Sequence, residues 1–252
     1  MVLKVDNLNA YYGDHHVLKN ISFEIEDILR PGEIAGQLVA ILGESGCGKS
    51  TFFKTLSGLK EYEGTISILN NEMEIINPIA GDVGFVDQKY TMFRHKTVYQ
   101  SLKFSLRDSN LNENEKKDKI ESLLNEMGIF HIKDKYPNEL SGGQKQRSAL
   151  LERLLRGNTY IILDEPFSGL DVKNKEASKR FIRNVVNQHE INTFLFSTHQ
   201  IDDAVELADV ILIFSNNGEL IYNLNLRKEG YEYGSYTSKH QTLTKEIKKI
   251  FT

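Results

Sequence analysis

The feature that most constrains this chain is a glycine-rich run that ends in a lysine and a serine, residues 43–50, which fits the pattern G-x-x-x-x-G-K-[S/T]. Glycines let backbone N–H groups turn inward around phosphate oxygens, where side chains would collide. An apolar run, 38–42, precedes the motif, and a stretch of helical character, 51–56, follows it. This strand–loop–helix setting aims the positive end of a helix at the same anion. The sequence therefore predicts a nucleotide site rather than an incidental glycine-rich turn.

Within this motif, individual side chains have distinct expected roles. Lys49 is expected to bridge the β- and γ-phosphates, and the Ser50 hydroxyl to hold Mg²⁺. Cys47 is the single cysteine of the chain, and its simplest interpretation is a small side chain that fits the loop. If it lies beside the phosphates, bound ATP should protect its thiol from alkylation. The residues expected to bind the nucleotide are Gly43, Glu44, Ser45, Gly46, Cys47, Gly48, Lys49, Ser50 and Thr51.

Two carboxylates follow directly on another apolar run. Residues 160–163 are apolar, and Asp164 and Glu165 come next. A buried strand would deliver both acids to one edge of a sheet. Asp164 is then expected to reach Mg²⁺, usually through water, and Glu165 to polarise the attacking water as general base.

Two further polar residues stand at strand ends. Gln88 comes shortly after the apolar run 83–86, and His199 follows 194–196. Because ligands bind outside the carboxyl ends of parallel strands, these residues and the phosphate loop can converge on one γ-phosphate. Gln88 is expected near the metal, together with Ser50 and Asp164, and His199 near the transferring phosphoryl group.

The apolar runs and the segments between them define the expected fold class. Short, wholly apolar runs such as 38–42 and 210–214, with helical segments between them, indicate a mainly parallel sheet buried on both faces. Residues 2–8, 17–25 and 64–69 alternate as antiparallel strands do. Residues 97–135 are instead rich in charge and contain an amphipathic helix over 112–128. We predict an α/β fold with a P-loop NTPase core, an antiparallel β subdomain and an inserted α-helical subdomain.

Composition narrows the class of protein. The chain has 252 residues and a net charge of −4, which argues against a protein that clamps nucleic acid by its overall charge. A single cysteine cannot form an intramolecular disulfide, so a reducing compartment is expected. No apolar run approaches the roughly 18–20 residues that a membrane span needs. The N-terminus also lacks the sustained apolar stretch of a signal peptide.

Residues 140–144 read Leu-Ser-Gly-Gly-Gln at the start of an amphipathic run. Taken alone, this is an ordinary capped helix with exposed N–H groups. With the phosphate loop and segments 162–166, 168–171 and 197–199 in the same order, the chain resembles the ATP-binding cassette (ABC) family over residues 1–225, specifically the ATPase subunits of ABC transporters. The resemblance implies one ABC ATPase domain over 1–252. Residues 1–88 and 156–225 would form the core and antiparallel β subdomain, 89–155 the helical subdomain, and 226–252 a tail.

The resemblance also assigns residues outside the phosphate loop. Tyr12 matches the aromatic position that stacks on adenine, with Tyr11 as the fallback. Asp171 matches a loop that acts across a subunit interface. The family works as a head-to-tail dimer around two ATP molecules, so the second subunit would be another copy of this chain or a homologous ATPase. The residues that match the signature contacting the γ-phosphate of ATP on the opposite subunit are Ser141, Gly142, Gly143 and Gln144.

The function implied is an ATP-hydrolysing motor that drives solute transport through separate transmembrane permease subunits, from the cytoplasmic face of the membrane. Residues 136–139 resemble bacterial importers, which also employ a substrate-binding protein; nucleic acid is not expected as a partner. The alternative is a soluble ABC ATPase acting on nucleic acid or ribosomes, disfavoured by a short insertion and a single P-loop. The chain departs from the family at a longer 25–37 segment and at Asp87, where an apolar or aromatic residue is usual.

Overall fold

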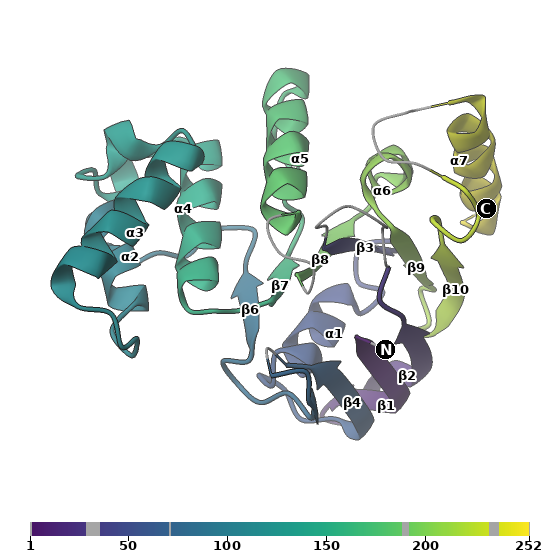
Figure 1. The fold of residues 1–252 in the computed structure, drawn as a ribbon. Helices are drawn as coiled ribbons and strands as arrows, with labels where there is room; N and C mark the ends of the chain where they lie inside the picture. Colours follow the sequence, from purple (N-terminus) through teal and green to yellow (C-terminus); the bar gives the residue numbers. More distant parts are fainter. Residues whose placement is uncertain (1, 29–35, 71, 188–191, 232–236, 252) are drawn as a thin grey trace.

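A computed structural model describes residues 2–28, 36–70, 72–187, 192–231 and 237–251 (Figure 1). The strands are β1 (Leu3–Tyr12), β2 (His15–Ile25), β3 (Gln37–Leu42), β4 (Glu63–Leu69), β5 (Ile75–Ile76), β6 (Val83–Val86), β7 (Tyr160–Leu163), β8 (Thr193–Thr198), β9 (Val210–Phe214) and β10 (Leu220–Asn225). The helices are α1 (Lys49–Leu56), α2 (Val98–Ser105), α3 (Glu113–Glu126), α4 (Gly142–Leu155), α5 (Val172–Val186), α6 (Ile201–Leu207) and α7 (Ser238–Ile250), with short 3-10 helices η1 (Phe130–Ile132) and η2 (Pro137–Glu139).

The central sheet has six strands in the order β10-β9-β3-β8-β7-β6. All neighbours are parallel except β9 and β10, which pair antiparallel. Strand β3 shows why this sheet is buried on both faces: Leu38 and Ala40 pack into one hydrophobic cluster, whereas Val39 and Ile41 pack into another. Successive side chains of a strand point to opposite faces, so a wholly apolar run suits a strand between two cores. The predicted α/β fold with a mainly parallel sheet is confirmed.

A second sheet of four antiparallel strands lies in the order β2-β1-β4-β5. Its first three strands are those predicted from alternation, and β5, only two residues long, was not predicted. Helix α1 contributes Phe52 and Phe53, both fully buried, to the cluster that contains side chains of both sheets. Of the long 25–37 segment, residues 29–35 lie outside the described part of the chain.

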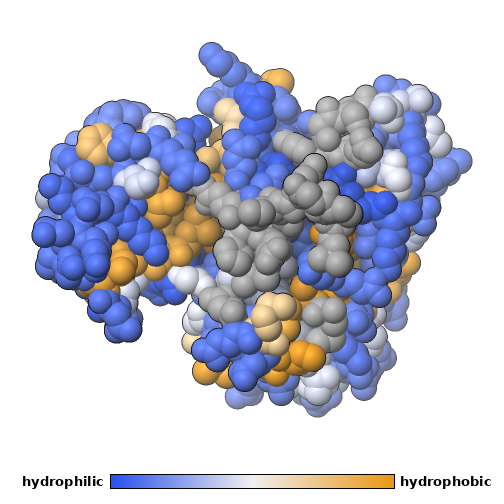
Figure 2. Space-filling model, viewed as in Figure 1, coloured by the Kyte–Doolittle hydropathy of each residue, from blue (hydrophilic) through white to orange (hydrophobic). Residues whose placement is uncertain are grey.

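Helices α2, α3 and α4 form a lobe at one end of the molecule (Figure 1). The predicted helix over 112–128 is present as α3, where a capping box formed by Asn112 and Glu115 begins the helix. Ile120 and Leu124 are its buried residues. The outer surface of this lobe is mostly hydrophilic in the space-filling view (Figure 2), as the charge run predicts.

The C-terminal tail contains a helix that was not predicted. The sequence assigned residues 226–252 only to a tail, and within it α7 occupies 238–250 and lies beside α6 (Figure 1). Leu243 and Ile247 are buried in the core cluster that also holds Ala204 of α6. Among the described helices, none is long and apolar enough to cross a membrane.

Candidate nucleotide site

A cavity of about 830 Å³ opens where the carboxyl ends of several parallel strands meet. The phosphate loop follows β3, the two carboxylates follow β7, and Gln88 and His199 come after β6 and β8. The structure therefore brings together four segments that are far apart in the sequence. The residues lining this cavity are Val17, Glu44, Ser45, Gly46, Gly48, Lys49, Ser50, Thr51, Gln88, Asp164, Glu165, Ser168 and His199.

The loop between β3 and α1 depends on glycine at its last position before the helix. Gly48 precedes α1 directly with a φ of 105°, a conformation that residues with side chains rarely adopt. A Cβ atom there would also lie 2.8 Å from Cδ2 of Leu18. The backbone therefore turns sharply here, and the first residues of α1 line the cavity, which suits an anion at the N-terminus of the helix.

Lys49 is held over the loop that precedes it. Its Nζ donates to the carbonyl oxygens of Gly43 at 2.7 Å and Glu44 at 2.8 Å. Lys49 is 8% exposed, so water hardly reaches its ammonium group, which interacts mainly with the loop. A phosphate in the cavity would offer this ammonium group a stronger, charge-assisted partner than either carbonyl.

Asp164 joins the phosphate loop to the end of β8. Its carboxylate accepts from Ser50 Oγ at 3.3 Å and from Ser197 Oγ at 2.6 Å. Hydroxyl, carboxylate and amide oxygens are ligands that suit Mg²⁺, and Gln88 lines the same cavity. Ser50, Asp164 and Gln88 therefore fit a magnesium ion. Sequence reasoning missed Ser197 as an individual residue, and its signal was a serine at the end of an apolar strand.

Glu165 and His199 contact each other at the rim of the cavity. Nδ1 of His199 lies 3.1 and 3.2 Å from the two carboxylate oxygens of Glu165. Glu165 has a φ of 48°, and its N–H donates to Ser197 Oγ at 2.8 Å, which helps to hold this costly conformation. The Glu165 side chain is 20% exposed and that of His199 57%. A carboxylate held beside an accessible imidazole can take a proton from water.

Tyr12 lies outside the residues that line the cavity. It ends β1, is 49% exposed, and has the Lys60 Nζ 3.9 Å from the centre of its ring. The fallback residue, Tyr11, stacks on His16 with ring centres 4.3 Å apart. Val17 of β2, which sequence reasoning did not single out, lines the cavity instead. Tyr12 nevertheless keeps an exposed ring face on the strand that pairs with β2.

Ser141, Gly142, Gly143, Gln144 and Asp171 also lie outside this cavity. Ser141 begins α4 through a capping box with Gln144. A Cβ atom on Gly142 or Gly143 would meet nothing within 4 Å, so both backbones face open space. Asp171 begins α5 in the same way, by accepting from the N–H of Asn174. That hydrogen bond is the main reason that the pKa of Asp171 lies below its usual value.

Cys47 does not offer an accessible thiol. Its side chain is 2% exposed and packs in the hydrophobic cluster that contains Phe52. Burial raises the pKa of the thiol, although the nearby Lys49 opposes this shift. A buried, protonated thiol is a poor nucleophile. The hypothesis that bound ATP protects Cys47 requires a thiol beside the phosphates, and this thiol is buried instead. Only the backbone of Cys47 remains suited to contact a phosphate.

Comparison with known proteins decides between P-loop families. The family model described as "ABC transporter" matches residues 18–168. The chain belongs to the ABC transporter family. A family member named sulfate/thiosulfate import ATP-binding protein CysA, from Acinetobacter baylyi, is 36% identical over 237 residues, covering 92% of this chain but 64% of its own length. A protein of the same name from Cucumis sativus is 32% identical, covering 85% of this chain and 60% of its own length.

The solved structures of family members agree with this fold. The structure of cbiO1 from Clostridium perfringens, described as part of the ABC transporter complex cbiONQ, has a TM-score of 0.77 and 28% identity. The match covers 99% of this chain and 96% of that one. A structure described as an ATP-binding subunit of an ABC transporter has a TM-score of 0.71 at 23% identity, and this likeness concerns the fold.

Proposed function

We propose that this chain is the ATP-hydrolysing motor subunit of an ABC importer and drives a solute through separate transmembrane permease subunits. The observation that carries the proposal is the convergence of Lys49, Ser50, Asp164, Glu165 and His199 on one cavity at the strand ends. The two relatives are named as import ATP-binding proteins, which supports import as the direction of transport. Both names describe import and neither describes an action on nucleic acid or ribosomes, so the alternative of a soluble ABC ATPase is not favoured.

In the proposed mechanism, the loop N–H groups and Lys49 hold the ATP phosphates. Ser50, Gln88 and Asp164 would hold Mg²⁺, which supplies charge neutralisation for the transferring phosphoryl group. Glu165 accepts a proton from the attacking water as general base. His199, through its contact with the Glu165 carboxylate, orients that base and stabilises charge near the γ-phosphate.

The proposed assembly contains two ATPase subunits. Gly142 and Gly143 have open space around their Cα atoms, which suits the approach of a phosphate held by a second copy or a homologous subunit. Tyr12 would stack on adenine, and Asp171 would act across the same interface. We also propose the subdomain boundaries 1–88 with 156–225 for the core and antiparallel sheet, 89–155 for the helical lobe, and 226–252 for the tail.

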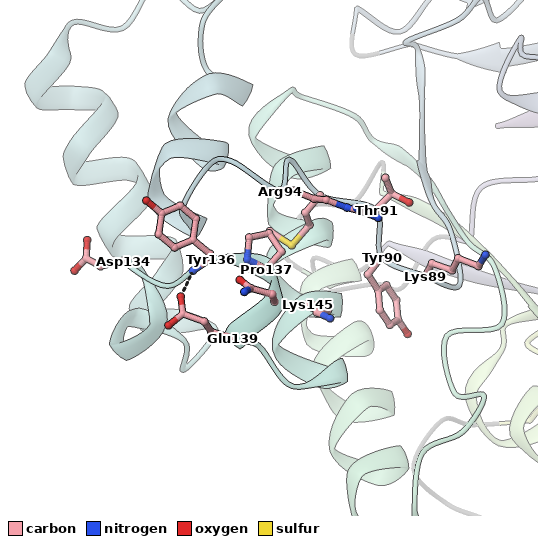
Figure 3. A pocket seen from close by; sticks show the side chains of 11 residues that line it. Lys89, Tyr90, Thr91, Arg94, Asp134, Tyr136, Pro137, Glu139 and Lys145 are labelled. Carbon is pink, nitrogen blue, oxygen red and sulfur yellow. Dashed lines mark hydrogen bonds between the residues drawn. The ribbon is translucent and has the colours of Figure 1, made fainter.

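We also propose that the permease contacts the helical lobe, and a cavity beside this lobe supports the proposal. A cavity of about 1000 Å³ lies between residues 89–94 and 134–139 (Figure 3). Tyr90, which lines it, donates to the carbonyl oxygen of Pro166 at 3.2 Å, one residue after Glu165. A permease segment seated in this cavity would thus be linked to the catalytic carboxylates. The motor would then sit at the cytoplasmic face of the membrane, and an importer would also employ a substrate-binding protein.

The test is the variant Glu165→Gln, which keeps the shape of the side chain and removes its basicity. We expect ATP hydrolysis to fall by roughly 10²–10⁴-fold, because general-base catalysis contributes about that much. Binding of a fluorescent ATP analogue should remain. Unchanged hydrolysis would refute the assignment of the base, and a wild-type chain that does not turn over ATP with its permease would refute the motor function.

A further inference from the structure

A buried network of charges joins helix α5 to helix α6. Lys179 on α5 contacts Asp203 at 3.0 Å and Glu206 at 2.6 Å on α6. Lys175, one turn earlier, contacts the same Asp203 at 2.8 Å. The side chains of Lys179 and Asp203 are only 6% and 5% exposed. Burial lowers the pKa of Lys179, but the acceptors Glu206 and Asp203 more than offset this and raise it above the usual value. The two helices are therefore fixed to each other by charged pairs that water hardly reaches.

Lys175 makes one further contact that Lys179 does not. Its Nζ donates to Oε1 of Gln200 at 2.5 Å. Gln200 is the residue directly after His199 and occupies the N-cap position of α6, where its side chain makes no capping hydrogen bond. The N–H of Gln200 also donates to Thr198 Oγ1 at 3.1 Å, which closes the turn around His199. Lys175 therefore contacts, through the side chain of Gln200, the segment that carries the histidine of the site.

The other end of Lys175 is tied to the start of α5. Its backbone N–H donates to the carbonyl oxygen of Asp171 at 2.8 Å, so the two residues are one helical turn apart. Asp171 begins the helix and is exposed outside the nucleotide cavity. Lys175 therefore connects the first turn of α5, which begins at Asp171, to the side chain of Gln200 next to His199.

We propose that Lys175 is a positioning residue for hydrolysis, which holds the His199 turn in register with Glu165 and couples it to the Asp171 segment. The proposal rests on the proposed ATPase function. Lys175 itself does not line the nucleotide cavity, so it acts through Gln200 and His199 rather than on ATP. Its loss should consequently affect the chemical step and not the binding of nucleotide.

The variant Lys175→Met tests this position with little disturbance to the network. Asp203 keeps its 3.0 Å ion pair with Lys179, so no buried carboxylate is left without a cation. We expect kcat for ATP to fall about 10-fold or more, because small misplacements of catalytic groups have effects of that size. KM should stay within about twofold, the pattern of an interaction that matters only in the transition state. Lys175→Arg should restore most of kcat.

The variant Gln200→Leu removes the acceptor and leaves every charged pair in place. If Lys175 acts through Gln200, this variant loses about as much kcat as Lys175→Met, and the double variant loses little more. An additive double variant, or a Gln200→Leu protein with wild-type kcat, would overturn the proposal.

Lys179→Met is the matched control, since it removes the same charge one turn away without contacting Gln200. It should lower the thermal midpoint while kcat of the folded protein stays within about twofold of wild type. Arg180→Met, at an exposed position of α5, replaces it if the Lys179 variant does not fold. Equal losses of kcat in the control and in Lys175→Met would mean that Lys175 only stabilises the fold and would overturn the proposal. Failure of all variants and wild type alike would instead count against the proposed ATPase function.

Discussion

Glu152 is an ionisable residue in surroundings that disfavour its charge. It lies on α4, is 4% exposed, and its Oε1 has no hydrogen-bond partner among the described residues. Ser148 of α4, which is fully buried, has a hydroxyl group in the same situation. Burial raises the pKa of Glu152 to about 7, while the charges of Arg153 and Arg156 oppose this. The folded protein therefore favours a protonated carboxyl on the helix that begins with the signature residues.

This raised pKa makes the stability of the protein depend on pH. Below about pH 4.5 the carboxyl is protonated in both states and costs nothing. As the pH rises from there to about 7, only the unfolded chain ionises, so the free energy of unfolding falls. The full loss above pH 7 is roughly 3 kcal/mol on the scale of 1.36 kcal/mol per pKa unit. In urea titrations, Glu152→Gln should remove this loss between pH 5 and 8 relative to wild type, and a parallel pH dependence of the two proteins would contradict it.

Cys47 gives a second prediction at the same scale. Because the thiol is 2% exposed and its pKa is raised, alkylation by a maleimide at neutral pH should be slow in the folded protein. Saturating ATP should change the rate little, since the side chain points into the core. Labelling should become rapid in urea, which serves as the positive control. Rapid labelling of the native chain that ATP blocks would show that the thiol faces the phosphates.

At the scale of elements, the sequence predicted the parts whose pattern is local. The short apolar runs lie in β3, β6, β7, β8 and β9, because burial on both faces favours apolar side chains. Helix α7 was missed because only two of its four buried residues, Leu243 and Ile247, are apolar, and the run around them is polar. Which side chains cover that face is decided by α6, far away in the sequence. The site was predictable where residues follow strands directly, whereas the position of Tyr12 depends on how two strands pair.

Helix α7 should therefore contribute to global stability. Ile247 is fully buried in the core cluster, and truncating such a side chain leaves a cavity. Ile247→Ala should lower the free energy of unfolding by about 2–5 kcal/mol. Ile250 lies on the same helix but is 37% exposed, so Ile250→Ala should cost less than about 1 kcal/mol. Equal urea midpoints for the two variants would mean that α7 does not fold with the core.

At the scale of the whole molecule, one chain contains only part of the expected site. The cavity gathers residues that we propose to hold phosphate and polarise water, but the signature residues and Asp171 are outside it. Those residues were assigned through family resemblance, and no local pattern in the sequence states which nucleotide they face. Exposure of the signature residues does not destabilise the N-terminus of α4, because Ser141 caps this helix from within the chain. The open face at Gly142 and Gly143 therefore needs no partner to be stable, and it is available for the proposed assembly.

Gly143→Asp separates assembly from nucleotide binding. A Cβ atom at Gly143 meets nothing within 4 Å, and an acid in the first turn of a helix is favourable, so α4 should fold normally. The carboxylate would, however, lie where the phosphate of a second subunit must approach. In the Glu165→Gln background, ATP should shift the protein to a dimer in light scattering, and Gly143→Asp should abolish that shift.

Gly143→Ala is the control for bulk and should retain the dimer. Binding of a fluorescent ADP analogue should stay within about twofold in every variant, because residue 143 lies outside the cavity. A dimer that survives Gly143→Asp would exclude the signature residues from the interface.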